Sequence, residues 1–438
     1  MKPAVEICTA RRGRVPHVRQ AAGVRRRIVG LIAVVALSGG VVGCSARSST
    51  HATIDVDAAV ALADQPVHVR VSGLRPRQRV VVAAQASDAQ GKGWRGEATF
   101  VADHDGAVDL DRSSPTTGTY SGTDGMGVFW SMRPATGDPD TAWFSPGYPA
   151  SRGAFEVRLT VAADGREIGA RTVTRQWTAA GVTHRTLTPD VDGMAGELFS
   201  PPAGAVRRPG VLLLGGSEGG VGRRYDAALL ASHGYPSLAL GYFGVPGLPA
   251  ALRDVPLEYF VTAAELLRAQ PGADPGRVVV NGYSRGAEAA LLLAGKYPGL
   301  VRGTVLYAPN DTVVPGFPEG GNAWTIGGEP VPRTAIAVDR VSGPVLAVAG
   351  GEDRVWRSAA QAQRIMQRLD DAKVTAPHQV LVYPDAGHGV GSFPYLPAGV
   401  AQSHPGSDFA RSLGGTRAAD AAARSDGWPK VLAFLAAA

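Results

Sequence analysis

The sequence predicts a chain of two folded parts: an all-β domain, then a doubly wound α/β domain with a mostly parallel sheet. Over residues 55–180, apolar and polar residues alternate with period two, and no long helical period interrupts them. Over residues 185–438, short apolar strands alternate with helical stretches. This second pattern is typical of a parallel sheet covered by helices on both faces, because each parallel connection needs a crossover.

The strands of the first part are short and end at turn residues. Val67, Val69 and Val71 alternate with polar residues, and the stretch 155–161 does the same. Asp164-Gly165 then offers a hairpin turn. We therefore expect an immunoglobulin-like β-sandwich. The glycine-rich segment 120–133 has no period and is expected to be a loop.

The second part shows strands and helices in regular alternation. Strands are expected at residues 194–199, 211–214, 236–240, 278–280, 303–307, 345–349 and 379–383, and helices at 225–233, 257–269, 287–294, 359–369 and 418–435. A long loop rich in glycine and proline, residues 310–339, is expected to lie over the strand ends and to shape a cleft.

A sharp glycine turn, Gly282-Tyr283-Ser284-Arg285-Gly286, stands between an apolar strand and a stretch of helix-forming residues. Strand, G-x-S-x-G turn and helix form the layout of a nucleophile elbow. The chain holds 57 glycines, and residues 215–219 fit the same pattern after another apolar strand. The pattern alone therefore does not choose between Ser284 and Ser217.

The positions of an acid and a base decide between the two serines. A serine nucleophile needs a histidine to take its proton and a carboxylate to hold that histidine. Asp353 follows the strand 345–349 and His388 follows the strand 379–383, which is the order Ser, acid, His expected after Ser284. We therefore assign Ser284 as nucleophile, His388 as base and Asp353 as acid.

The glycine loop around Ser217 lies where doubly wound hydrolases carry an oxyanion loop. We expect backbone amides of Ser217 or Glu218 to join the Arg285 amide in stabilising the oxyanion. The alternative acids are Asp311, which also follows a strand, and more weakly Glu352 and Asp385. The alternative base is His404; His378 precedes its strand and is therefore misplaced.

The sequence offers no metal site and no sign of a cofactor. It has no HExxH, clustered carboxylates or CxxC. His68 and His104 have no metal-binding residues beside them in the sequence, so we expect them at the surface. The only cysteines are Cys8 and Cys44, so no thiolate metal site and no internal disulfide of the mature protein is expected.

The N-terminal residues resemble the signal peptide of a bacterial lipoprotein. Basic residues up to Arg27 precede an apolar run, residues 28–42, too short for an ordinary membrane span. Val41-Val42-Gly43-Cys44-Ser45 resembles a lipobox. We expect residues 1–43 to be removed, Cys44 to be lipidated, and residues 44–54 to be a tether from the outer side of the cell membrane. An ordinary cleaved signal or a signal anchor is the alternative.

The net charge of +6 gives no support for nucleic-acid binding. Residues 1–43 contain eight basic residues and one acidic residue, a net charge of +7, so the remainder carries −1. A basic surface on the folded part is therefore not expected, and nucleic acid is excluded as a partner.

Several stretches resemble the acyl-CoA thioesterase and bile acid-CoA:amino acid N-acyltransferase family over about residues 55–437. They are QPVHVRVSGLRPRQRV, ATFVADHDGAVDL, TYSGTDGMGVFWSMRP, LLLGGSEGG, LEYF, NGYSRGAE, GGEDRVWRS, YPDAGHGV with PYLP, and LGGT…AAARSDGWPKVLAFL. The resemblance implies a β-sandwich followed by an α/β-hydrolase domain, with Ser284, Asp353 and His388 as the triad. Many members carry a cysteine nucleophile, whereas Ser284 favours hydrolysis over transfer to amino acids. Relatives usually have lysine at position 285, and their loop matching 310–339 is longer.

These observations together predict a membrane-tethered serine hydrolase that cleaves acyl thioesters through an acyl-enzyme and needs no cofactor. The alternatives are an extracytoplasmic carboxylesterase or lipid acyltransferase acting on envelope esters, and a non-catalytic envelope-binding lipoprotein. The oligomeric state and the acyl donor are not determined by these patterns.

Overall fold

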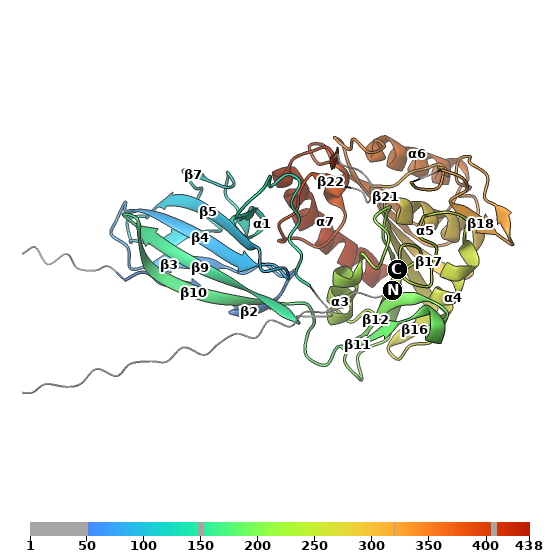
Figure 1. Cartoon of the computed structure of the whole chain (residues 1–438), viewed down its shortest axis with the longest axis horizontal. Coiled ribbons are helices and arrows are strands. Elements are labelled where there is room, and N and C mark those ends of the chain that lie inside the picture. Colours follow the sequence, from blue (N-terminus) through green and yellow to red (C-terminus); the bar gives the residue numbers. More distant parts are fainter. Residues whose placement is uncertain (1–50, 148–152, 319, 404–409) are drawn as a thin grey trace, which may run out of the picture. The chain divides into compact units, whose positions relative to one another are not determined.

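The computed structural model describes residues 51–147, 153–318, 320–403 and 410–438 (Figure 1). The expected signal sequence, its lipidation site Cys44 and the alternative base His404 lie outside these residues. None of the helices in these ranges is long and apolar enough to span a bilayer.

The strands of the first part form two sheets. One has the order β1-β3-β6, and the other β2-β10-β9-β4-β5-β7 with β8 also paired to β5. All pairs are antiparallel except β2 with β10. The bounds are β1 Thr53–Val56, β2 Val60–Leu62, β3 Val69–Ser72, β4 Arg79–Ser87, β5 Gly93–Val101, β6 Val108–Asp109, β7 Thr117–Gly118, β8 Arg133–Pro134, β9 Ala154–Ala163 and β10 Arg166–Gln176.

The alternation of apolar and polar residues places one face of each long strand inside. In β5, for example, Trp94, Ala98 and Phe100 are buried, while Arg95 and Val101 are exposed. The segment expected to be a loop contains a one-turn helix, α1 Gly127–Trp130, whose four residues are all buried. The immunoglobulin-like arrangement and the domain boundary at residues 180–185 stay predictions.

The second part is built on one eight-stranded sheet with the order β11-β12-β14-β13-β16-β17-β20-β21. β12 is antiparallel to β11 and β14, and the other neighbours are parallel. This confirms the doubly wound, mostly parallel sheet. The sheet strands are β11 Thr183–Leu187, β12 Ala195–Ser200, β13 Arg208–Leu214, β14 Ser237–Gly241, β16 Ala273–Tyr283, β17 Val301–Tyr307, β20 Val345–Gly350 and β21 His378–Tyr383.

Helices connect and cover these strands. They are α2 Pro189–Asp192, α3 Arg224–Ser232, α4 Leu257–Arg268, α5 Arg285–Lys296, α6 Ser358–Asp371 and α7 Arg417–Ala437, with a 3₁₀ turn η1 His388–Val390. The loop of residues 310–339 contains β18 Trp324–Ile326, which pairs with β15 Val255–Pro256 and β19 Glu329–Pro330. A further hairpin joins β22 Ala401–Ser403 to β23 Ala410–Ser412.

β11 was not predicted from the sequence, because this strand lies at the sheet edge and four of its five residues are exposed. Its sequence, THRTL, therefore has no buried face to produce an apolar alternation. The strand predicted at residues 278–280 is also shorter than β16. β16 begins at Ala273, and the register shift between Pro209 and Gly210 of the neighbouring β13 accommodates the extra residues.

Asp64, which follows β2, connects the first part to the helices of the second. Its Oδ2 accepts hydrogen bonds from the ring of His233 at 2.6 Å and from the indole N–H of Trp428 at 2.8 Å. Nearby, the ring of Trp177 packs on Tyr225, with 4.7 Å between centroids. The described residues, from 51 to 438, accordingly belong to one compact unit with a shared buried cluster.

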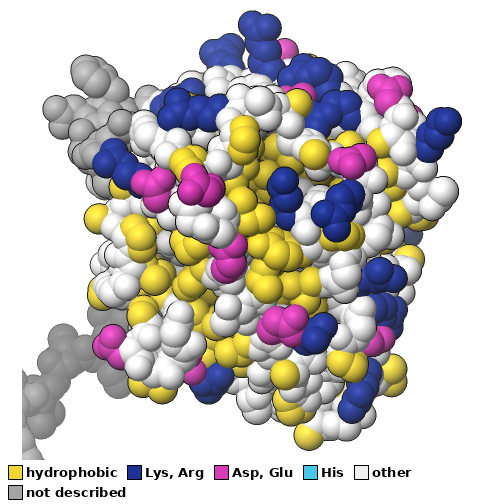
Figure 2. All heavy atoms as spheres, turned by 90° about the vertical axis from the view of Figure 1, so that its right-hand side faces the viewer, with side chains coloured by type: hydrophobic (Ala, Val, Ile, Leu, Met, Phe, Trp, Pro, Cys, Tyr) yellow, Lys and Arg dark blue, Asp and Glu magenta, His cyan; other side chains and the backbone are white. Residues whose placement is uncertain are grey.

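Apolar side chains are not confined to the interior. Figure 2 shows them gathered in the middle of one face of the molecule, with lysine, arginine and acidic side chains scattered around them. This face is the right-hand side of Figure 1, where α4, α5 and β18 lie.

Candidate active site

Ser284 stands between the end of β16 and the start of α5, at the apex of a sharp turn. Its backbone has φ 57° and ψ −117°, a conformation that side-chain-bearing residues rarely adopt. Such a residue costs about 1–3 kcal/mol, which the surrounding packing must offset. The Ser284 N–H donates to the Tyr307 carbonyl at 2.9 Å, which ties the turn to the neighbouring β17.

The two glycines of the turn are required by close backbone contacts. A Cβ on Gly282 would lie 2.1 Å from the Gly286 carbonyl oxygen, and one on Gly286 would lie 2.4 Å from the carbonyl oxygens of Gly215 and Leu214. Neither position has room for a side chain. The elbow can therefore form only with glycine on both sides of Ser284.

The structure brings the three predicted triad residues together. His388 Nε2 lies 3.0 Å from Ser284 Oγ, and His388 Nδ1 lies 2.8 Å from Asp353 Oδ2. All three side chains are buried. Because an ionised carboxylate can only accept, Nδ1 donates to Asp353, and Nε2 is left to accept the Ser284 proton. This is the geometry that general-base activation of a serine needs.

Asp353 is held as a carboxylate. Burial opposes its ionisation, but the hydrogen bond and the charge interaction with His388, together with weaker hydrogen bonds that include the Val355 N–H, outweigh burial and keep the pKa of Asp353 below its ordinary value. Its Oδ1 accepts from the backbone N–H groups of Val355 at 2.8 Å and Trp356 at 3.3 Å. The acid is thus oriented by its own loop before it orients the histidine.

The glycine loop after β13 lies against Ser284. A Cβ on Gly216 would lie 3.0 Å from Ser284 Cβ, and Ser217 and Glu218 line the same pocket as Ser284. Glu218 Oε1 accepts the Gly216 N–H at 2.9 Å, which holds the loop in place. Arg285 is the first residue of α5, so its N–H has no partner within the helix. These amides stay the predicted oxyanion donors.

The alternative acids lie elsewhere. Asp311 forms ion pairs with Arg364 at 2.8 Å and Arg368 at 3.7 Å, so its negative charge is balanced by two arginines of α6. Glu352 and Asp385 are exposed. The misplaced histidine, His378, pairs with Asp370 at 3.0 Å.

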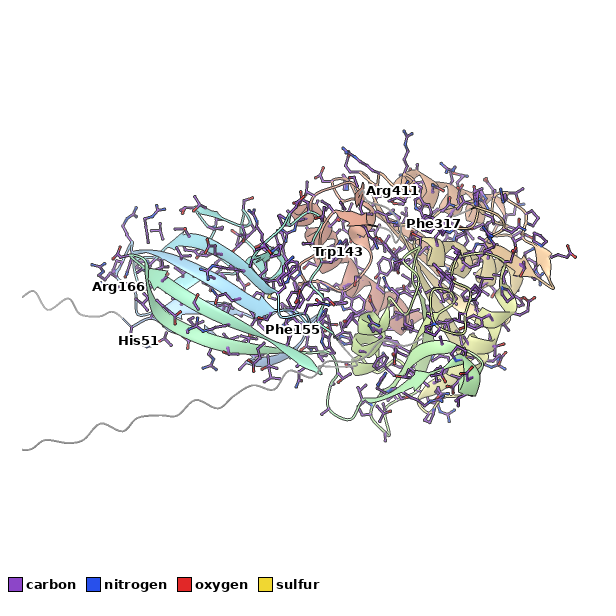
Figure 3. All side chains as sticks on the ribbon, in the orientation of Figure 1. His51, Trp143, Phe155, Arg166, Phe317 and Arg411 are labelled. Atoms are coloured by element: carbon purple, nitrogen blue, oxygen red, sulfur yellow. The ribbon has the colours of Figure 1, made fainter. Side chains whose placement is uncertain are left out.

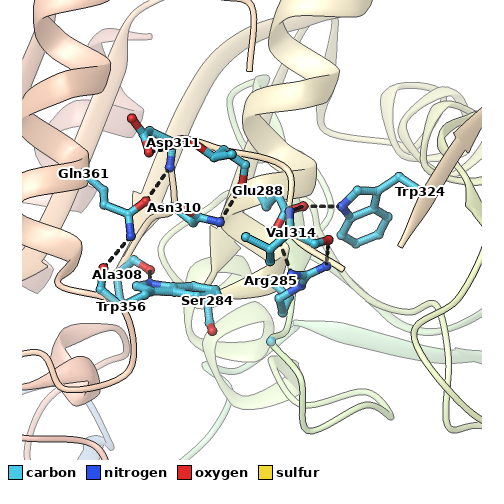
Figure 4. A network of polar contacts seen from close by, with 12 residues as sticks. Ser284, Arg285, Glu288, Ala308, Asn310, Asp311, Val314, Trp324, Trp356 and Gln361 are labelled. Atoms are coloured by element: carbon cyan, nitrogen blue, oxygen red, sulfur yellow. Dashed lines mark hydrogen bonds and ion pairs between the residues drawn. The ribbon is translucent and has the colours of Figure 1, made fainter. Parts of the chain in front are cut away.

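A buried ion pair lies directly behind the elbow (Figure 4). Arg285 Nη1 is 3.1 Å from Glu288 Oε2, and neither side chain is more than 5% exposed. Glu288 Oε1 also accepts from the indole N–H of Trp324 at 2.7 Å and from the Val314 N–H at 3.2 Å. Arg285 in turn donates to the Val314 carbonyl at 3.1 Å. The loop of residues 310–339 is thereby fixed to the first turn of α5.

Two cavities with shared lining residues adjoin at the candidate site. Figure 3 labels Trp143, Phe317 and Arg411, which are among the residues that line them. The first, of about 280 Å³, contains Ser284 and His388 and is also lined by Phe317 and Arg411. The second, of about 300 Å³, shares three lining residues with the first and has aromatic walls; these residues are Glu218, Tyr283 and Gln402, and the walls include Trp143, Phe144 and Phe393.

Sequence reasoning missed several residues around the triad. The rings of Trp356 and Tyr283 lie 5.5 Å and 5.3 Å from the imidazole of His388. Their closeness to Asp353 and Ser284 in sequence was the available signal. The Glu288 network had no signal, because its partners are far apart in the chain.

The surface position of His68 was predicted, but the two carboxylates beside it were not. It lies near the surface, as expected, but its Nε2 is 3.0 Å from Asp109 Oδ1 and 3.5 Å from Asp111 Oδ2. The two aspartates come from another strand region and so were not visible as its companions. This group is largely exposed.

Two family models match the chain. Residues 64–189 match the "Acyl-CoA thioester hydrolase/BAAT N-terminal region", and residues 324–438 match the "BAAT / Acyl-CoA thioester hydrolase C terminal". The second match includes Asp353 and His388.

Curated relatives match along most of the chain. Acyl-coenzyme A thioesterase 6 of Mus musculus is 31% identical over 400 residues, which cover 85% of this chain and 93% of that protein. Acyl-coenzyme A amino acid N-acyltransferase 1 of Mus musculus is 30% identical, covering 86% and 95%. Among solved structures, a dienelactone hydrolase-like phosphotriesterase from metagenomic libraries has 18% identity and a TM-score of 0.38, covering 59% of this chain and 98% of that chain. On the sequence matches, the chain belongs to the acyl-CoA thioester hydrolase/BAAT family.

Proposed function

We propose that this protein hydrolyses acyl thioesters through a Ser-His-Asp triad and an acyl-enzyme. The observation that carries the proposal is the pair of contacts made by His388, at 3.0 Å to Ser284 Oγ and 2.8 Å to Asp353 Oδ2. The family of the chain, with thioesterases among its relatives, supports the thioester as substrate.

In this proposal Ser284 Oγ attacks the thioester carbonyl carbon while His388 Nε2 takes its proton. The resulting oxyanion accepts hydrogen bonds from the Arg285 amide and from an amide of Ser217 or Glu218, each worth about 3 kcal/mol. The intermediate collapses, the carbon–sulfur bond breaks, and the imidazolium protonates the departing thiolate. Water, activated by His388, then releases the acyl group as a carboxylic acid and restores Ser284.

The triad acts equally on esters, so the leaving group must be measured. We expect purified mature protein to turn over acyl-CoA faster than p-nitrophenyl esters of the same chain length. A fluorophosphonate probe is expected to label the wild-type protein in the same preparation. Faster turnover of lipid or aryl esters would show that the protein is an esterase and not a thioesterase. Absence of labelling would contradict the proposal that it is a serine hydrolase.

We also propose that the mature protein is extracytoplasmic and anchored through a lipid on Cys44. The support is the basic, apolar and lipobox-like order of the N-terminal residues. Two acyl chains or more anchor a protein stably, whereas one chain gives only marginal binding.

Replacing Cys44 with alanine is expected to move the protein from the membrane fraction to the soluble fraction. The same change is expected to abolish incorporation of labelled palmitate. A Cys8→Ala variant is the matched control, since this cysteine precedes the expected cleavage site, and it should remain membrane-bound. Palmitate labelling that survives in Cys44→Ala would contradict the lipobox assignment.

A further inference from the structure

The loop that carries His388 is held by one turn of α7. Asp420 and Arg424, four residues apart on this helix, are both more than nine-tenths buried. Asp420 Oδ1 accepts the Gly387 N–H at 2.7 Å, and Arg424 Nε donates to the Gly389 carbonyl at 2.8 Å. The peptide groups on both sides of His388 are therefore bound by two charged side chains.

The packing around these glycines leaves no room for a side chain at either position. A Cβ on Gly387 would lie 2.1 Å from the Gly414 carbonyl oxygen, and one on Gly389 would lie 2.4 Å from Asp420 Oδ2. The His388 N–H also donates to the Leu413 carbonyl at 2.8 Å. The backbone of the base is thus fixed from three directions, by α7 and by the segment that precedes it.

The strength of the two contacts follows from their charge. Hydrogen bonds to ionised groups are roughly twice as strong as neutral ones. Asp420 also lies in the first turn of α7, where the helix dipole favours a negative charge. Burial raises the pKa of Asp420, while Arg424 and the Gly387 N–H act in the opposite direction. Asp420, whose ionised form is disfavoured by burial, is therefore hydrogen-bonded to the loop that carries His388.

Resting on the proposed function, we propose that Asp420 and Arg424 are positioning residues that hold His388 Nε2 in line with Ser284. They contact neither Ser284 nor the ring of His388 by a hydrogen bond, and act through Gly387 and Gly389. Asp353 orients the imidazole ring of His388, and Asp420 and Arg424 of α7 hold the backbone of His388 in place.

Alanine at Asp420 removes the acceptor for Gly387, whereas asparagine keeps an acceptor and removes only the charge. We expect Asp420→Ala to lower kcat about 10- to 100-fold, because a misplacement near 1 Å can cost that much. KM is expected to change less than about threefold. Asp420→Asn should retain kcat within about threefold at the pH optimum.

Arg424 gives a second, independent pair of variants. Arg424→Met keeps much of the length but removes the donor to Gly389, and should lower kcat about tenfold. Arg424→Lys keeps one donor and should recover most of that loss. The matched control is Asp426→Asn, an exposed position on the same helix that pairs with Tyr383 and Lys430, and it should leave both kcat and the rate of fluorophosphonate labelling unchanged.

The rate of fluorophosphonate labelling reports on His388 without any assumption about the substrate. It should fall in Asp420→Ala and Arg424→Met in proportion to kcat. Folded Asp420→Ala that labels at the wild-type rate would overturn the positioning role while leaving the hydrolase intact. A wild-type protein that does not label would overturn both. If Asp420→Ala does not fold, a folded Arg424→Met variant that labels at the wild-type rate overturns the proposal.

Discussion

Ser284→Ala is expected to lower kcat by about a millionfold, because the nucleophile and its base act as one unit. Binding of substrate should persist, since the oxyanion donors and pocket walls remain, so KM should change little. The measurement is single-turnover hydrolysis of the preferred acyl thioester, together with loss of fluorophosphonate labelling.

Ser217→Ala is the matched control, because Ser217 occupies the same position in the second G-x-S-x-G sequence. Ser217 lines the pocket, but among the described residues it makes no hydrogen bond with His388, so labelling should remain. A Ser284→Ala/His388→Ala double variant should be no slower than either single variant. Labelling that is lost in Ser217→Ala and kept in Ser284→Ala would reverse the assignment of the nucleophile.

Glu288→Ala is expected to destabilise the fold by about 3–5 kcal/mol. The change leaves the buried Arg285 charge without its partner and strands the N–H groups of Trp324 and Val314. The free energy of unfolding is obtained from urea denaturation followed by circular dichroism. The matched control is Glu265→Ala, which breaks an exposed pair of the same i,i+3 spacing with Arg268 and should cost less than about 1 kcal/mol.

The pair with Arg285 does not fully offset burial, which raises the pKa of Glu288 to about 7. In the unfolded chain this glutamate ionises near 4.5, so folding opposes its ionisation. The stability of the wild-type protein relative to Glu288→Gln should therefore fall as pH rises from about 4.5 to above 7. A difference that is constant over this range would contradict the raised pKa.

The meeting of Ser284, Asp353 and His388 could be predicted because each of them closes its own strand. In a doubly wound sheet the carboxyl ends of parallel strands meet at one edge, so the order of the strands in sequence was enough. The long parallel strands were visible as apolar runs because both of their faces are buried. Their exact bounds were less so: β16 begins five residues before the strand expected at 278–280.

The supports of the triad could not be predicted. Asp420 meets Gly387 across 33 residues of sequence, and Trp324 meets Glu288 across 36. No periodicity records such contacts, because they depend on how α7 and the loop 310–339 pack on the finished sheet. The edge strand β11 was missed for a different reason, since an exposed strand has no buried face to show in its sequence.

The contacts of Asp64 bear on how this protein can be divided. A carboxylate from the first part receives hydrogen bonds from His233, directly after α3, and from Trp428 on α7. A fragment that begins near residue 185 would leave the indole N–H of Trp428 without that acceptor, and would uncover the ring of Tyr225 that Trp177 covers. We therefore expect such a fragment to be less stable than the whole chain, because these contacts would be replaced by contacts with water.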